Sequence, residues 1–425
     1  MQSEIALNVQ QSIRPGECVD TYYAGKENSE KQCHATVTDN RFNQGLQSLA
    51  SGSSSTVTFN PNEGLGEVLL IMTLAAPSNA TGLALNKGWG YQFLRRVGYR
   101  YGSSQLYYIT GQQNFVQTLA LCEDSGKKDQ IVYLGGQALL DPSDWADVTK
   151  RTAYIYLRLP HSSPALAGGS LPFPTDVLTA PVQLQIDWAD FSSVITQVPL
   201  SAGVLPTAFQ SAQVNFTQVT MQDAGNLIAR RFDMSKHALT IPLPEGWTQE
   251  AVQFPFTSGA DGGFSLSLTG CKAGDLKMLR IWFTDPSYVS NASGLRNPNV
   301  FIPPAQIRFA INGLIYLDSI GASYLLTDLI RRRVPPTASG TFTLAPGGVL
   351  EQFAAQSTWV EVNLAQPHAI GDTGEVILVH GVPVMNSVLS LTGVMPGAAQ
   401  NYVCNVEYVL NCSWMASRGS AEFVF

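Results

Sequence analysis

Three carboxylates spaced three residues apart, Asp141, Asp144 and Asp147, are the closest approach in this sequence to a catalytic acid–base set. A glycosidase needs two carboxylates held at a fixed separation across a cleft. Residues three apart instead share one helical turn, and Asp141 and Asp144 on either side of Pro142 suit the capping of a helix N-terminus. We therefore interpret the cluster as the start of a short helix.

No other spacing is typical of a metal centre or an activated nucleophile. The histidines lack HxH, HxxE and HExxH patterns, and the cysteines form no CxxC pair. The serine-rich stretches 51–55 and 102–104 contain no GxSxG elbow, and the glycine pairs lack the lysine of a phosphate-binding loop. We predict no catalytic residue, no metal site and no cofactor. The residues considered are His34, His161, His237, His368, His380, Cys18, Cys33, Cys122, Cys271, Cys404 and Cys412.

The composition favours buried neutral surface over charged surface. The chain has 425 residues, of which 45% are hydrophobic and 13% are charged, about half the charged fraction of an average soluble protein. A formal net charge of -7 disfavours nucleic-acid binding, which needs clustered Lys and Arg. The composition suits a protein that buries surface against copies of itself, and equally an ordinary secreted all-β protein.

The beginning of the sequence, MQSEIALNVQQSIRPGE, lacks the basic region and apolar core of a secretory signal. The most apolar run, residues 68–77, is too short to cross a bilayer. We expect a soluble chain made in the cytosol, where widely spaced cysteines are free buried thiols by default.

Strand signals dominate the chain, and each is bounded by Gly, Pro, Asn or Asp. Helical patterns are few and occur at 114–122, 142–149 and 323–334. Many short strands with long loops predict an all-β sandwich or jelly roll and disfavour a βαβ fold. The expected strands are 56–60, 66–74, 105–110, 153–159, 182–188, 213–219, 238–243, 264–269, 277–283, 307–317, 359–364, 375–382, 387–391 and 402–410.

A polar, proline-containing connection at 195–211 divides these strands into two similar sets. Each half has about 200 residues, a suitable size for one eight-stranded sandwich with long loops. We expect an arm at 1–20, a first jelly roll at 21–205 and a second at 206–425. The arm lacks sustained alternation and therefore buries little on its own.

Several distinctive sequence blocks follow one another in a definite order along the two halves. FLRRVGYRYGSSQLYYITGQQNFVQTLALC at 93–122 places Gly98 before an edge strand and Gly111-Gln112 before a helix. LRLP at 157–160 leads through a Pro/Gly-rich loop to LPFPTDVL at 171–178 and a further strand. The second half has FSLSLTGCKAGDLKMLRIWF, then IRFAINGLIYL, and a closing block at 359–391.

This series resembles the major capsid proteins of the double jelly-roll lineage, which includes adenovirus hexons, tailless membrane-containing bacteriophages, virophages and nucleocytoplasmic large DNA viruses. The resemblance covers most of residues 20–425. It departs from the large-virus members after Val57, where NPNEGLGEVLL stands in place of their RxGD strand signature.

The resemblance implies two tandem eight-stranded jelly rolls with a few short loop helices. It implies a major capsid protein of an icosahedral double-stranded DNA virus, assembled in the host cell into pseudo-hexameric homotrimers that tile the virion shell. The partners would be other copies, neighbouring capsomers, and penton and minor capsid proteins, without sequence-specific nucleic-acid binding; whether an internal membrane lies beneath the shell stays open. The arm would run along the inner face of the shell.

The loop around LPFPTDVL has a physical role in this interpretation. Pro, Gly and apolar residues fix an extended path at low entropic cost and present a neutral surface to a neighbour. We therefore expect Phe173 to lie in a contact between subunits.

Two other functions are compatible with a β-sandwich. The first is a carbohydrate-binding, lectin-like protein, in which Trp89, Trp145 and Trp188 could line a sugar platform, although Trp188 closes an alternating strand and suits the core. The second is a glycoside hydrolase or esterase, which the absence of a suitable carboxylate pair or nucleophile disfavours.

Overall fold

The structure is a computed structural model that describes residues 37–59, 64–101, 104–120, 125–158, 178, 180–198, 201–221, 239–242, 246–285, 301–302, 304–320, 359–365, 367–370, 375–378, 381–417 and 420–424. Outside these residues lie the expected arm at 1–20, Phe173 with most of the loop around it, and the expected helix at 323–334. The same holds for His34, His161, His237, His380, Cys18, Cys33 and Cys122.

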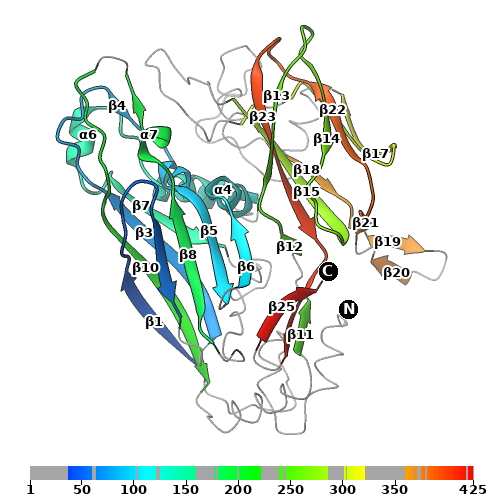
Figure 1. Ribbon diagram of the computed structural model, residues 1–425, viewed down its shortest axis with the longest axis horizontal. Helices are drawn as coiled ribbons and strands as arrows, with labels where there is room; N and C mark the ends of the chain where they lie inside the picture. The colour runs from blue at the N-terminus through cyan, green and yellow to red at the C-terminus, as the bar shows by residue number, and fades with distance from the viewer. Residues whose placement is uncertain are drawn as a thin grey trace.

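Eight strands of the first half form two antiparallel sheets, ordered β1-β10-β3-β7 and β2-β8-β5-β6 (Figure 1). Counted in chain order within this half, the sheets read 1-8-3-6 and 2-7-4-5, which is the order of a jelly roll. The strands are β1 (Val37–Gly45), β2 (Ser54–Thr58), β3 (Gly64–Leu74), β5 (Leu94–Tyr101), β6 (Ser104–Ile109), β7 (Thr152–Leu157), β8 (Val182–Trp188) and β10 (Phe209–Met221). A short pair, β4 (Leu83–Ala84) and β9 (Thr196–Gln197), flanks them.

The second half repeats this strand order. Its sheets are β12/β13-β23-β15-β18 and β14-β22-β16-β17, where β12 and β13 act as one interrupted strand because both pair with β23. The strands are β12 (Trp247–Thr248), β13 (Val252–Thr257), β14 (Gly263–Leu268), β15 (Asp275–Thr284), β16 (Gln306–Ile311), β17 (Leu314–Ile320), β18 (Val360–Asn363), β22 (Leu389–Val394) and β23 (Asn401–Leu410). We call the two halves the first and second rolls.

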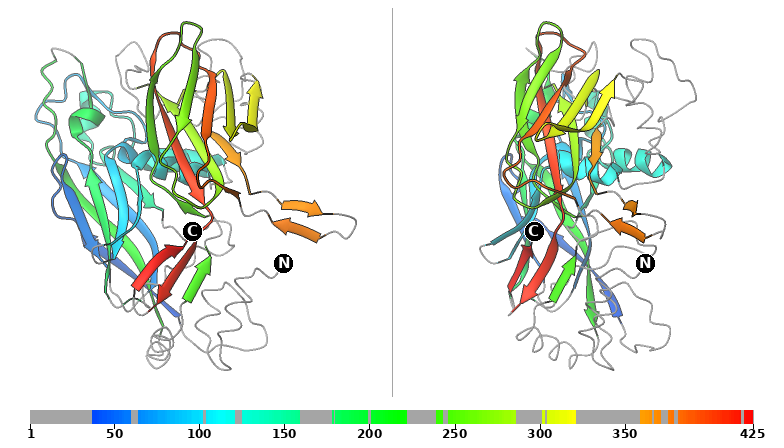
Figure 2. Two further views of the ribbon diagram at one scale, coloured as in Figure 1. Left: turned by 45° about the vertical axis from the view of Figure 1, so that its right-hand side comes forward. Right: turned by 90° about the vertical axis from the view of Figure 1, so that its right-hand side faces the viewer.

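Three smaller β elements accompany the second roll. β21 (Val382–Pro383) pairs with β15, and β19 (Pro367–Ile370) forms a hairpin with β20 (Glu375–Leu378) that stands apart from the roll in Figure 2. β11 (Leu239–Pro242), β24 (Ser413–Ser417) and β25 (Ser420–Val424) form a separate three-stranded sheet.

Each roll has its core between the inner faces of its two sheets, because buried and exposed positions alternate along the strands. In the first roll Val57, Leu70 and Ile186 point inward and are fully buried. In the second roll Leu279 and Phe309 do the same. The expected all-β fold of two jelly rolls is confirmed.

Helices occupy the connections. α3 (Trp89–Gln92) precedes β5, and α7 (Phe191–Val194) follows β8, while α4 (Gly111–Ala120), α5 (Ser125–Leu134) and α6 (Pro142–Ala146) lie between β6 and β7. The helices expected at 114–122 and 142–149 are thus confirmed, whereas α5 was not expected. No helix in the described part of the chain is long and apolar enough to span a membrane.

The boundary expected at residues 205/206 is wrong, because β10 belongs to the first roll. It is the central partner of β1 and β3. Its first residue, Phe209, packs against Phe93, Trp188 and Phe191 with ring centroids 4.7–5.4 Å apart. The first roll therefore extends at least to Met221, and the connection at 195–211 is internal to it.

The strand expected at 307–317 is in fact a hairpin. β16 and β17 pair across a two-residue turn in which Asn312 has φ 50° and Gly313 has φ 83°. Positive φ at both turn residues is the pattern of a type I′ hairpin turn. The turn makes β17 a separate strand at the edge of its sheet.

Candidate functional site

The carboxylate cluster at the start of α6 is a cap, as expected. Asp144 accepts hydrogen bonds from the backbone N–H groups of Leu140 and Asp141 at 3.0 and 3.1 Å, and its carboxylate lies 2.6 Å from Nζ of Lys150. These partners, Lys150 foremost, lower the pKa of Asp144 to about 2. An ionised carboxylate with three donors stabilises the helix start and is unsuited to general-acid chemistry.

Among the described residues, no group of three or more His, Cys, Asp or Glu side chains could hold a metal ion. Three cysteines within this part of the chain, Cys271, Cys404 and Cys412, are free, and the latter two are buried. Burial raises the pKa of the Cys271 thiol to about 11 and raises that of Cys404 further. Buried protonated thiols of this kind are unreactive.

The alternative of a sugar platform is not supported, because its three tryptophans, Trp89, Trp145 and Trp188, are all buried, as the strand pattern predicted for Trp188. Nε1 of Trp89 donates to the carbonyl of Gln137 at 2.9 Å, and Nε1 of Trp188 donates to Oγ of Ser55 at 2.9 Å. Nε1 of Trp145 donates to the carbonyl of Leu83 at 3.3 Å. These side chains belong to the core of the first roll and are unavailable to a glycan.

The most polar buried region of the described structure lies where α4 passes between the two rolls. One flank of α4 binds the free edge of β7 through Asn114. Its Nδ2 donates to the carbonyl of Tyr156 at 2.9 Å, and its Oδ1 accepts from the N–H of Arg158 at 3.1 Å. The amide side chain thus pairs the edge as a neighbouring strand would.

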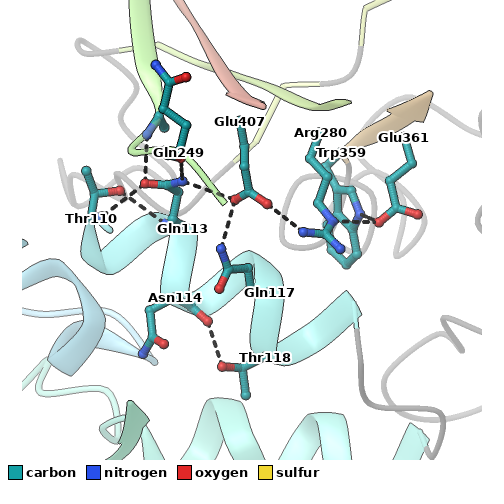
Figure 3. Close-up of polar contacts among 11 residues, drawn as sticks. Thr110, Gln113, Asn114, Gln117, Thr118, Gln249, Arg280, Trp359, Glu361 and Glu407 are labelled. Carbon is teal, nitrogen blue, oxygen red and sulfur yellow. Dashed lines mark hydrogen bonds and ion pairs between the residues drawn. The ribbon is translucent and has the colours of Figure 1, made fainter. Parts of the chain in front are cut away.

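The other flank of α4 binds the second roll in the same way (Figure 3). Nε2 of Gln113 donates to the carbonyl of Gln249 at 2.7 Å, and its Oε1 accepts from the N–H of Ala251 at 2.8 Å. Both backbone groups lie in the break between β12 and β13. Gln113 of the first roll therefore forms hydrogen bonds with the backbone groups at the break in this strand of the second roll.

A buried ion-pair network continues from this point (Figure 3). Oε2 of Glu407 accepts from Nε2 of Gln113 and of Gln117, each at 3.3 Å, and its Oε1 lies 2.5 Å from Nη1 of Arg280. Nε of Arg280 lies 3.0 Å from Oε1 of Glu361, which also accepts from Nε1 of Trp359 at 3.0 Å.

Burial and pairing act in opposite directions on these charges. Burial raises the pKa of Glu407, and Arg280, Gln117 and Gln113 oppose that rise. Burial alone would lower the pKa of Arg280, but Glu407 and Glu361 outweigh it and raise that pKa. Removing either partner would leave an uncompensated buried charge. The first roll contributes to this network through the amide hydrogen bonds of Gln113 and Gln117.

Two further contacts join the rolls around this network. Arg96 on β5 forms an ion pair with Glu250, and its guanidinium lies 4.6 Å from the ring centroid of Tyr108. Phe115 on α4 packs against Phe301 with ring centroids 6.4 Å apart. The two rolls are thus joined by apolar, polar and charged contacts.

No family model and no curated protein matches the sequence. Solved structures match along nearly the whole chain. VP54 of PBCV-1, fitted into a cryo-EM reconstruction of the virophage Sputnik, has a TM-score of 0.58 at 11% identity, covering 94% of this chain and 99% of its own. The Faustovirus major capsid protein has a TM-score of 0.55 at 8% identity, covering 100% and 97%.

The Sputnik virophage structure determined by cryo-EM at 3.5 Å is also similar, with a TM-score of 0.52 at 10% identity, covering 94% of this chain and 91% of that one. At such low identity a likeness of this extent establishes the architecture. This chain has the double jelly-roll fold.

Proposed function

We propose that this chain is a major capsid protein of an icosahedral double-stranded DNA virus and that three copies form a pseudo-hexameric capsomer. The observation that carries the proposal is the pair of rolls with identical strand order, joined by the buried contacts of α4. Three such bodies around one axis supply six similar rolls, and hence a six-sided unit from a threefold assembly.

Rigidity of the two-roll body is the property that a shell component needs. A shell built from many copies requires the same angle between the rolls in each one. The buried carboxylate of Glu407 accepts hydrogen bonds from Gln113 and Gln117 of the first roll, and a change of that angle would separate it from these donors. A specific polar network fixes one geometry where apolar packing alone would tolerate several.

The end-to-end likeness to the Faustovirus major capsid protein, which spans both chains almost completely, supports the same function. In this proposal the protein resides in the virion, acts through its surfaces and carries out no catalysis. Other copies are its first partners; penton and minor capsid proteins follow from the same proposal.

The test is the mass and outline of the purified chain. Size-exclusion chromatography with light scattering is expected to give a stable species of three times 45.9 kDa, and negative-stain electron microscopy a particle with a six-sided outline. A monomer at micromolar concentration, or a protein retained specifically on a glycan array, would contradict the proposal.

A further inference from the structure

The outer face of one sheet of the second roll shows how a roll is covered by its neighbour. Arg280 on β15 pairs in register with Glu361 on β18 and with Glu407 on β23. The residues on either side of it, Leu279 and Ile281, point into the core of the second roll. Arg280 therefore points outward from its own roll and is buried because the first roll, through α4, lies over it.

The equivalent row of the first roll is partly exposed. Leu69 on β3 pairs in register with Tyr156 on β7 and with Asn215 on β10, the same three strands of the jelly-roll order. Tyr156 is 49% exposed, and Tyr154 is exposed beside it. We call this surface, defined by Leu69, Tyr154, Tyr156 and Asn215, the bare face.

The bare face is hollowed. A depression of about 350 Å³ crosses its four strands, and Oδ1 of Asn215 is enclosed there without a hydrogen-bond partner. An enclosed acceptor without a donor is destabilising unless a further group reaches it.

β17 lies on the opposite side of the molecule from β1, β3, β7 and β10 and carries a second surface with exposed apolar side chains (Figure 1). β17 is the free edge of its sheet, and its residues Leu314 (64% exposed), Ile315 and Tyr316 are exposed. Met385 and Val388 are exposed next to it, where Asn312 binds both the backbone N–H and carbonyl of Val388. We call this surface the β17 edge.

The corresponding edge of the first roll is covered. β6 occupies the position of β17 in the strand order, and its Tyr107 and Tyr108 are buried. Arg96, which lies over Tyr108, pairs with Glu250 of the second roll. Within one chain, then, the β6 side of the first roll meets the outer face of the second roll, while the β17 edge and the bare face have no such neighbour in the described structure.

We propose that the β17 edge of one copy binds the bare face of the next, so that the contact between copies repeats the contact between the rolls within a copy. This inference rests on the proposed capsid trimer and names the surfaces that would form it. A head-to-tail contact of this kind closes into a ring after three copies when each roll advances by about a sixth of a turn. Both surfaces expose aromatic or aliphatic side chains, which are enriched in the cores of protein interfaces, and the bare face also carries the charged residues Arg41 and Glu67.

The test places a lysine on each surface separately, because a buried unpaired charge prevents such a contact. Tyr156→Lys and Ile315→Lys are each expected to be monomers by light scattering, with circular dichroism and melting of the monomer showing that they fold. Mixed in equal amounts they are expected to form a one-to-one dimer, because each supplies the intact surface that the other lacks. Tyr133→Lys and Val204→Lys, at residues 54% and 51% exposed elsewhere, are the matched controls and are expected to remain trimers.

The outcomes separate this inference from the proposed function. If wild type is a trimer and both lysine variants remain trimers, or the controls dissociate equally, the surfaces are wrong and the capsid proposal stands. Single variants that dimerise alone indicate a symmetric contact, and a mixture without heterodimer excludes the head-to-tail pairing; each overturns the inference. A monomeric wild type overturns both. Tyr154→Glu and Leu314→Glu repeat the test if a lysine variant fails to fold.

Discussion

The residue with the most demanding surroundings is Glu407, a carboxylate fully buried between two rolls. The ionised carboxylate of Glu407 is stabilised by Arg280, whose guanidinium also binds Glu361. Breaking a buried ion pair by removing one partner is strongly destabilising, whereas replacing the whole pair with apolar groups is often tolerated. The individual side chains here are therefore strongly coupled.

Arg280→Met is expected to lower the free energy of unfolding by about 3–5 kcal/mol, because Glu407 stays buried without its counter-ion. Urea denaturation followed by circular dichroism measures this. The double variant Arg280→Met/Glu407→Leu is expected to recover part of the loss. The control is Arg308→Met, which breaks the exposed pair with Asp318 and is expected to change stability by less than about 1 kcal/mol. Equal effects at Arg280 and Arg308 would contradict this account.

Asp144 predicts a pH dependence at low pH. Its folded pKa of about 2 lies below the usual 3.8, so its ionised form adds stability above pH 3.8 that is lost as the pH falls through about 2. Asp144→Asn is expected to lower the melting temperature near neutral pH and to have little effect near pH 2. Lys150→Met, which removes the largest cause of the shift, is expected to flatten this dependence. A pH-independent effect of Asp144→Asn would count against the cap.

At the scale of elements, the pairing of β5 with β6 depends on a glycine. A Cβ on Gly98 would lie 2.1 Å from the carbonyl oxygen of Tyr107 and 2.5 Å from the ring of Tyr108. Because backbone sets the first of these contacts, a side chain there must push the strands apart.

Gly98→Ala is expected to destabilise the chain by about 1–3 kcal/mol, the usual range for overpacking, measured by urea denaturation. Gly45→Ala on β1 is the matched control, since a Cβ there meets no atom within 4 Å, and it is expected to be neutral. If both substitutions behave alike, close approach of β5 and β6 is not the reason for the glycine.

Local pattern predicted most elements but not their partners. The strand at 182–188 coincides with β8, because alternation is a property of the segment itself. The sequence VTDNRFNQG of β1 has little such pattern, and the strand exists through its pairing with β10 along its whole length. The assignment of β10 to the first roll was missed for the same reason: strand pairing is a long-range choice. The hairpin turn at Asn312-Gly313 could have been predicted, since Asn-Gly is a strong turn signal.

The joining site between the rolls could not have been predicted from spacing. Gln117 and Glu407 are 290 residues apart, and Gln113 and Glu407 are 294 apart. A glutamine on an amphipathic helix is ordinarily a solvent-facing residue, and nothing in the local sequence marks Gln113 as buried. What the sequence did indicate, through the number of expected strands and the size of each half, was the pair of rolls that brings these residues together.

At the scale of the whole molecule, the arm stays a prediction. Deleting residues 1–20 is expected to leave a folded trimer, because the segment has little capacity to bury surface, and to impair assembly of closed shells. Light scattering reports the trimer and electron microscopy the shells. Loss of soluble protein on deletion would place the segment in the fold.

Phe173 also stays a prediction about the assembled molecule. Phe173→Asp is expected to yield monomer or aggregate, because a charge buried in a contact between copies has no partner. Trimers with an unchanged melting temperature would show that the loop at 171–178 is exposed to solvent and that its apolar composition has another cause.

The two rolls differ in the chemistry of one matching row: Glu361, Arg280 and Glu407 in the second, and Tyr156, Leu69 and Asn215 in the first. The charged row is buried by the folding of a single chain. This step is unimolecular, because the chain that connects the two rolls keeps them at a high effective concentration. In the proposed trimer, the neutral row is buried only when two copies meet, at a rate that depends on the protein concentration. Burial of the charged row thus precedes the association of copies in the proposed trimer.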